Sequence, residues 1–174
     1  NIGYGSAINL ALKRTNAKYY LILNPDCIVS EKTILELRSN LENENDIDVV
    51  APITIDKKNR VNERYGYFIS SKIKKKNFEN IKFKQVDFVI GCIFLIKSKI
   101  FKKIGLFDEN FFMNYEEIDF FKRLRNSNYN IFINKKNKAK HLEGMSSFSK
   151  KNKSRDIIEY TKVSKWHLAW GKYY

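Results

Sequence analysis

The chain has 174 residues, enough for one domain with a sizeable core, and its 43% hydrophobic and 14% aromatic residues exclude an intrinsically disordered chain. It contains no run of about 18 apolar residues, so the sequence predicts no membrane-spanning helix. The net charge of +14 suits an anionic partner such as nucleic acid, a membrane surface or a phosphorylated substrate. A base composition biased toward A and T would produce the same lysine- and asparagine-rich loops without any such function.

The first residue and the two cysteines bear on the cellular context of the protein. The chain starts at Asn1, and its opening residues lack the basic-then-apolar layout of a signal peptide. We therefore expect that it begins inside a longer gene product. Cys27 and Cys92 do not have the spacing of a metal site, and we interpret them as small buried thiols in a reducing cytosol.

The first third of the chain alternates between helical and strand-like patterns. In chain order we expect a helix over 6–15, a strand over 19–23, a helix capped by Ser30 and a strand over 48–51 that ends at Pro52. The first strand ends at Asn24-Pro25-Asp26, because proline cannot donate to a ladder and Asn and Asp favour turns. The alternation of strand, helix and strand favours a parallel α/β sheet.

The middle of the chain differs in kind. Residues 53–85 are polar, basic and weakly periodic, and we interpret them as a long loop that contacts substrate, with a short hairpin around 64–69. After it the patterns predict a strand over 86–97 interrupted at Gly91, a helix from Ser98 to Gly105, a helix over 115–126, and strands over 130–134 and 139–141.

The last segment, residues 155–174, predicts an amphipathic helix. Its apolar side is formed by Ile158, Val163, Trp166, Trp170 and Tyr173, with Lys162, Lys165 and Lys172 beside them. Aromatic rings next to lysines suit a membrane interface with anionic headgroups. The alternative is that the aromatic rings pack on the domain.

Three places along the sequence could hold reactive groups. Asp26 directly follows a buried strand, where a carboxylate could bind a hard divalent cation, or it could simply belong to an Asn-Pro-Asp turn. His141, after a short strand, is either a structural histidine or the nitrogen ligand of a metal site otherwise made of oxygens.

The third place is an acidic cluster among aromatic residues, formed by Asp108, Glu109, Glu116, Glu117 and Asp119. Neighbouring carboxylates and apolar rings disfavour the charged form, which raises the pKa of a carboxyl group toward that of a useful general base. Alternatively, Glu116 and Glu117 only stabilise the dipole of the helix that starts there.

Five segments taken in order resemble glycosyltransferase family 2, and most closely the rhamnosyltransferase-like enzymes of cell-surface polysaccharides. They are NIGYGSAIN, YLILNPD, GCIFLIKSKIFKKIGLFDENFF, YEEIDFFKRLR and HLEGMSS, and they extend to about Ser147. The resemblance implies a GT-A-type, Rossmann-like α/β fold with a mixed sheet flanked by helices. It also implies a catalytic domain over 1–150 that is N-terminally truncated, because the family's first strand–helix–strand unit, which binds the nucleobase, is missing, and an amphipathic helix over 151–174.

The resemblance also assigns roles to residues. Asp26 and His141 would bind Mg²⁺ or Mn²⁺, and Asn24 would contact the sugar nucleotide or a metal-bound water. Glu116 and Glu117 match the Glu-Asp base motif, with Glu117 as the base although the family usually has aspartate there, and Asp119 in support. The remaining donor-binding positions are Asn1, Gly3, Gly5 and Gly91.

The function implied is inverting transfer of a sugar from a nucleoside-diphosphate donor to a hydroxyl of a glycan or lipid-linked acceptor. The protein would be cytoplasmic, or peripheral at the inner face of the membrane through its C-terminal helix. One alternative is an inactive or truncated relative with a structural role in a complex. A nucleic-acid-binding module is a remote alternative, because no such motif is present and the aromatic residues alternate with acids that repel phosphate.

Overall fold

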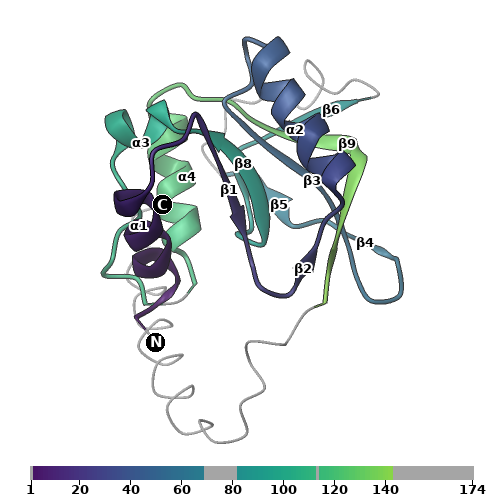
Figure 1. Ribbon diagram of the computed structural model, residues 1–174, viewed down its shortest axis with the longest axis horizontal. Helices are drawn as coiled ribbons and strands as arrows, with labels where there is room; N and C mark the ends of the chain where they lie inside the picture. The colour runs from purple at the N-terminus through teal and green to yellow at the C-terminus, as the bar shows by residue number, and fades with distance from the viewer. Residues whose placement is uncertain (1, 69–81, 113, 143–174) are drawn as a thin grey trace, which may run out of the picture. The chain divides into compact units, whose positions relative to one another are not determined.

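The computed structural model describes residues 2–68, 82–112 and 114–142 (Figure 1). Asn1, the segment after residue 142 with the expected helix over 155–174, and the expected boundary at residue 150 lie outside the described residues. None of the helices within the described ranges is long and apolar enough to span a membrane.

The centre of the fold is a mixed sheet with the strand order β1-β8-β3-β9-β2. These strands are β1 (Tyr19–Leu23), β8 (Ile93–Lys97), β3 (Val49–Ile55), β9 (Ile131–His141) and β2 (Cys27–Ile28). Two further strands join it, β4 (Val61–Asn62) on β3 and β6 (Phe83–Val86) on β9, while β5 (Tyr65–Gly66) and β7 (Phe88–Val89) form a separate small sheet.

The prediction of a parallel sheet is wrong for most of these pairs. Strand β8 lies between β1 and β3 and is antiparallel to both, and only β3 and β9 are parallel. The strand–helix–strand pattern of residues 19–55 correctly implies that β1 and β3 point the same way. It cannot reveal that a later strand enters between them.

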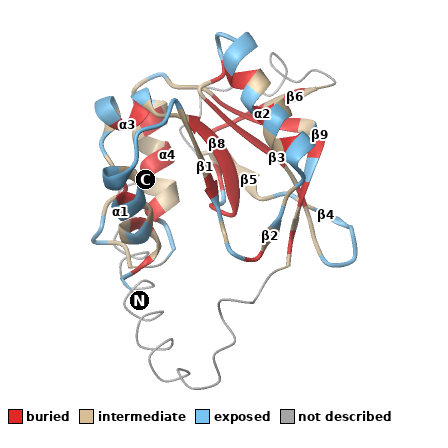
Figure 2. Ribbon diagram, in the orientation of Figure 1, coloured by how far each residue is buried: buried red, intermediate tan, exposed pale blue. Residues whose placement is uncertain are grey.

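Helices cover both faces of the sheet (Figures 1 and 2). On one face lie α1 (Tyr4–Arg14), α3 (Lys99–Ile104) and α4 (Glu116–Asn126), and on the other lies α2 (Glu31–Asn43). Alternate residues of one strand supply the two cores: Phe94 and Ile96 of β8 pack with α4, whereas Leu95 packs with α2. The alternation follows from the two-residue period of a strand, and the result is the mixed sheet flanked by helices that the sequence predicted.

Several predicted element boundaries need correction. Strand β3 does not end at Pro52 but continues to Ile55, because Pro52 stands at a register shift in the ladder with β9, where its missing N–H costs little. Residues 53–85 are not one long loop, since β3 and β4 form a hairpin there. No hairpin forms around 64–69 in the described part of that segment; β5 pairs with β7 instead. The two strands expected at 130–134 and 139–141 are one strand, β9.

Two of the three helix ends that the sequence assigned to a particular residue agree with the structure. Ser30 caps α2, its hydroxyl accepting a hydrogen bond from the Thr33 amide at 3.1 Å. Gly105 ends α3 with φ at +85°, a conformation that favours glycine. Ser98 precedes α3 in a helical conformation and its side chain makes no cap hydrogen bond, so its predicted role as a cap is wrong.

Candidate active site

Asp26 and His141 meet at the end of the sheet where β1 finishes. The chain turns at Asn24-Pro25-Asp26 into β2, which pairs with the last residues of β9 so that Cys27 lies directly opposite His141. The Leu142 amide also donates to the Asp26 carbonyl at 2.8 Å. Two residues 115 positions apart are thereby brought together, with Asp26 Oδ1 and His141 Nε2 separated by 3.2 Å.

The donor atoms of this pair fit a divalent cation. Both side chains are buried, at 8% and 7% exposure. Two ligands at right angles on an ion, with bonds of about 2.1 Å, lie about 3.0 Å apart, close to the observed separation. His141 Nδ1 and Asn24 Oδ1 are buried and have no hydrogen-bond partner among the described residues. Buried polar atoms without partners are rare, and such atoms beside a carboxylate fit a site that completes its contacts with a bound group.

The five carboxylates of the acidic cluster divide into two groups. Asp108 accepts hydrogen bonds from the backbone and side chain of Asn110, and Glu109 accepts them from Asn9 and Lys13. Asp119 pairs with a guanidinium, that of Arg123, at 2.8 Å. That guanidinium also donates to the carbonyls of residues 104 and 106, so Asp119 holds the connection between α3 and α4. These three carboxylates are engaged in building the fold.

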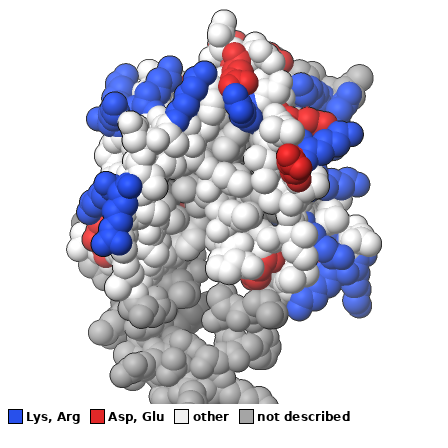
Figure 3. Space-filling view, viewed as in Figure 1, with Lys and Arg blue, Asp and Glu red and all other residues white. Residues whose placement is uncertain are grey.

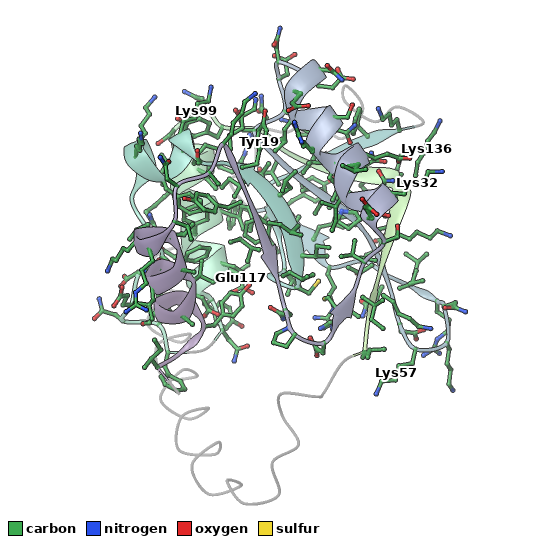
Figure 4. All side chains as sticks on the ribbon, viewed as in Figure 1. Tyr19, Lys32, Lys57, Lys99, Glu117 and Lys136 are labelled. Atoms are coloured by element: carbon green, nitrogen blue, oxygen red, sulfur yellow. The ribbon has the colours of Figure 1, made fainter. Side chains whose placement is uncertain are left out.

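Glu116 and Glu117 behave differently. Each has one buried carboxylate oxygen that finds no partner within the described part of the chain. Burial, together with the charge of Glu117, raises the pKa of Glu116 to about 7. Burial also raises the pKa of Glu117, although the backbone amides of Gly91 and Tyr115 partly favour its charged form. Glu117 projects from the start of α4 near the carboxyl end of β1 (Figure 4), and a carboxyl group in such surroundings can accept a proton near neutral pH.

Comparison with known proteins identifies the family. The model of the family described as "Glycosyl transferase family 2" matches residues 1–105. The chain belongs to glycosyl transferase family 2. It is 30% identical over 146 residues to the low-salt glycan biosynthesis hexosyltransferase Agl10 of Haloferax volcanii, a match covering 75% of this chain and 46% of that protein. It is 31% identical over 131 residues to an uncharacterized glycosyltransferase of Rickettsia typhi, covering 72% and 40%.

A solved structure supports the fold of this family 2 chain. The crystal structure of GalNAc-T7 with UDP, GalNAc and Mn²⁺ superimposes with a TM-score of 0.63 and 13% sequence identity. The match covers 82% of this chain and 31% of that one. The chain spans less than half the length of the curated relatives that it matches.

The glycines expected to line the donor cleft of this family 2 chain have a packing role in the structure. Gly3 has φ at +92°, and a Cβ there would lie 2.6 Å from the Phe112 carbonyl oxygen. A Cβ at Gly5 would approach the Cβ of Phe107 to 3.2 Å and that of Glu116 to 3.6 Å. The glycines therefore allow α1 to pack closely on the segment that leads to the catalytic candidates, while contact with a donor stays a prediction.

Two residues that the sequence analysis missed connect the parts of the site. The Tyr4 hydroxyl donates to the Gly91 carbonyl. Burial raises the pKa of Tyr4, as do the charges of Glu117, Glu116, Cys92 and Cys27. Asn9 is 1% exposed, and its amide donates to the Phe107 carbonyl and accepts from the Phe107 amide. A tyrosine between two glycines was the signal for Tyr4, and a lone polar residue on the apolar side of α1 was the signal for Asn9.

Proposed function

We propose that this chain contributes the metal and acceptor side of an enzyme that transfers a sugar from a nucleoside-diphosphate donor to a hydroxyl of a glycan or lipid-linked acceptor. The observation that carries the proposal is the pairing of Asp26 with His141 where β1 finishes. Glu117 lies near the same end of β1 (Figure 4). Membership of family 2 supports glycosyl transfer, and a hexosyltransferase among the relatives supports a hexosyl donor. The similar fold of an enzyme crystallised with UDP and Mn²⁺ supports a nucleotide sugar and a divalent cation.

Asp26 and His141 are the residues that would hold Mg²⁺ or Mn²⁺. Such a cation neutralises the negative charge that develops on a departing nucleoside diphosphate. Asn24 has a buried side-chain oxygen available for the same region, and its backbone amide, which donates to the Cys92 carbonyl at 2.9 Å, fixes the turn. The turn between β1 and β2 is therefore held on both sides before a donor arrives.

Glu117 is the proposed general base. One Glu117 oxygen has no partner among the described residues, and its raised pKa suits removal of the proton from an acceptor hydroxyl. The hydroxyl oxygen would then attack the anomeric carbon, which gives inversion in a single displacement. The charge of Glu117 in turn raises the pKa of the buried Glu116, so the two carboxyl groups do not readily carry negative charge together. Asp119 acts as a positioning residue through Arg123.

The charged surface bears on the partners of the protein. On the face in Figure 3, lysine and arginine side chains lie around the rim, over α1, α3 and the β3–β4 hairpin, and the centre of the face is largely uncharged.

We further propose that the enzyme is cytoplasmic and that its residues 155–174 bind an anionic membrane. Co-sedimentation of the full-length protein with anionic vesicles checks it, and equal recovery with neutral vesicles would contradict it.

The proposed activity is tested with the full-length protein, Mn²⁺ and a panel of UDP-, GDP- and dTDP-sugars, by measuring nucleoside diphosphate release with and without chelator. We expect release from at least one donor that stops on chelation, and a loss of about 10²-fold in Asp26→Asn. Asp48→Asn is a matched control, because Asp48 pairs with Lys97 away from this turn. Release that is insensitive to chelator and to Asp26→Asn would contradict the metal assignment. Absence of release from every donor would favour an inactive relative with a structural role.

A further inference from the structure

The metal side of the site contains a third group with ligand chemistry, the thiol of Cys27. Within the described residues, one ligand atom each from Asp26, Cys27 and His141 lies within 4.8 Å of the other two. The cross-strand pairing of β2 with β9 creates this proximity by placing Cys27 directly opposite His141. Among the described residues no group bonds His141 Nδ1, which is buried, so the imidazole is not tied to the fold through that nitrogen while Nε2 faces Asp26.

A carboxylate, an imidazole and a thiolate form a donor set for a different class of cation from Mg²⁺. Zn²⁺ binds all three, with bonds of about 2.0 to 2.3 Å, so neighbouring ligand atoms in a tetrahedral site lie about 3.3 to 3.7 Å apart. The Asp26–His141 separation of 3.2 Å and the spread of 4.8 Å over the three atoms need only small side-chain adjustments to reach this geometry. Soft thiolates select thiophilic ions, whereas Mg²⁺ prefers oxygen ligands.

We propose that Cys27 is a third protein ligand that makes this centre bind a thiophilic divalent cation, such as Zn²⁺ or Cd²⁺, more tightly than Mg²⁺. The proposal rests on the metal centre of the proposed function and adds its ion preference. On binding, a bond forms between the ion and Cys27 Sγ while the thiol proton passes to water, and no electron is transferred. The bond replaces the hydrogen bond of 3.2 Å that Cys27 Sγ donates to the Cys92 carbonyl.

The second cysteine does not share this position. Cys92 is 3% exposed, lies among the apolar residues of the cluster formed with Ile93 and Ala139, and is not one of the three potential ligands. Cys27 is half-buried and adjacent to Asp26 in the chain. Substitutions at the two cysteines therefore form a matched pair. Each removes a thiol from the same region, but only the substitution of Cys27 removes a potential metal ligand.

A consequence for activity follows from the shared ligands. An ion held by Asp26, Cys27 and His141 would occupy the residues that Mn²⁺ would use. Zn²⁺ and Mn²⁺ should therefore compete, and added Zn²⁺ should lower Mn²⁺-dependent turnover.

The test is a titration of the full-length protein with Cd²⁺, followed by the ultraviolet sulfur-to-cadmium charge-transfer band, with Mn²⁺ binding measured separately by electron paramagnetic resonance. We expect one equivalent of Cd²⁺ to produce the band in the wild type and in Cys92→Ser. In Cys27→Ser we expect the band to be lost and Cd²⁺ affinity to fall by about tenfold or more, while Mn²⁺ affinity changes less than about threefold.

Two outcomes overturn the inference: an unchanged band and Cd²⁺ affinity in Cys27→Ser, or loss of the band in Cys92→Ser alone. Mn²⁺ binding by Cys27→Ser also reports that the variant is folded, and Cys27→Ala offers a second variant should the serine variant not fold. If the wild type binds Mn²⁺ and Cys27→Ser leaves Cd²⁺ binding unchanged, only this inference fails. If the wild type binds Cd²⁺ through Cys27 but shows no metal-dependent release from any donor, the proposed function fails and the inference stands.

Discussion

Glu116 makes the stability of the protein depend on pH in a direction opposite to that of most carboxylates. Its side chain is buried at 3% exposure, and its pKa is raised from 4.5 to about 7. Between these values the folded protein keeps a proton that the unfolded chain has lost. The stabilisation from this proton is fully present below pH 4.5 and is lost as the pH rises through the folded-state pKa.

The size of the effect follows from the same pKa values. A rise from 4.5 to about 7 corresponds to a fall of about 3 kcal/mol in the free energy of unfolding across this window. We expect Glu116→Gln to remove this fall, because glutamine has nearly the same volume and no charge. The variant should be more stable than the wild type by up to about 3 kcal/mol near pH 8 and should lose that advantage near pH 4.

Urea denaturation of both proteins across this pH range measures the effect, and Glu109→Gln is the matched control. Glu109 is exposed, and its hydrogen bonds with Asn9 and Lys13 lower its pKa, so its substitution should give no gain at high pH. Equal pH slopes in the wild type and Glu116→Gln would refute the reasoning, since they would mean that Glu116 ionises as it does in the unfolded chain.

Two further predictions concern the packing of α1 on the segment before α4. Gly3→Ala should lower the free energy of unfolding by about 2 kcal/mol or more, because it adds strain at a positive φ and a clash with the Phe112 carbonyl. Gly105 also has a positive φ, but a Cβ there would meet only a side-chain atom at 4.0 Å. The difference in unfolding free energy between the two variants, measured by chemical denaturation, therefore reports the clash at Gly3. Equal losses of stability would argue against that clash. Asn9→Ala should cost about 1 to 3 kcal/mol by leaving the Phe107 amide and carbonyl unpaired. The exposed Asn110→Ala should cost less, and an equal cost measured by denaturation would contradict a buried role for Asn9.

Local features of the fold could be predicted from the sequence because neighbouring residues determine them. The apolar run of β1 ends at Leu23 as expected, and the serine cap of α2 is present. The placement of β8 between β1 and β3 was not predictable, because it depends on which strand edges remain open after residues far apart have folded. The predicted strand end at Pro52 was wrong for a similar reason. The ladder between β3 and β9 has a register shift at this proline, and the local sequence does not reveal that shift.

In the candidate site, too, local features could be predicted from the sequence, whereas contacts between distant residues could not. Spacing alone could not bring Asp26 to His141, because their contact depends on the pairing of β2 with β9, and β2 has only two residues. The resemblance to family 2 supplied that expectation. Resemblance could not, however, show which carboxylates of the acidic cluster keep a buried oxygen without a partner among the described residues, since the hydrogen bonds of Glu109 and Asp119 depend on Asn9 and Arg123.

The central claim, that Glu117 is the base of a sugar transfer, is tested most directly by the pH dependence of turnover in the full-length protein with its active donor and Mn²⁺. Because the raised pKa of Glu117 must be exceeded before it can accept a proton, wild-type turnover should fall as the pH drops through that value. Glu117→Gln should lower turnover by about 10²-fold or more, remove this pH dependence and leave Mn²⁺ binding unchanged, while Glu109→Gln behaves as the wild type. A Glu117→Gln enzyme that keeps wild-type turnover and the same pH profile would contradict the account.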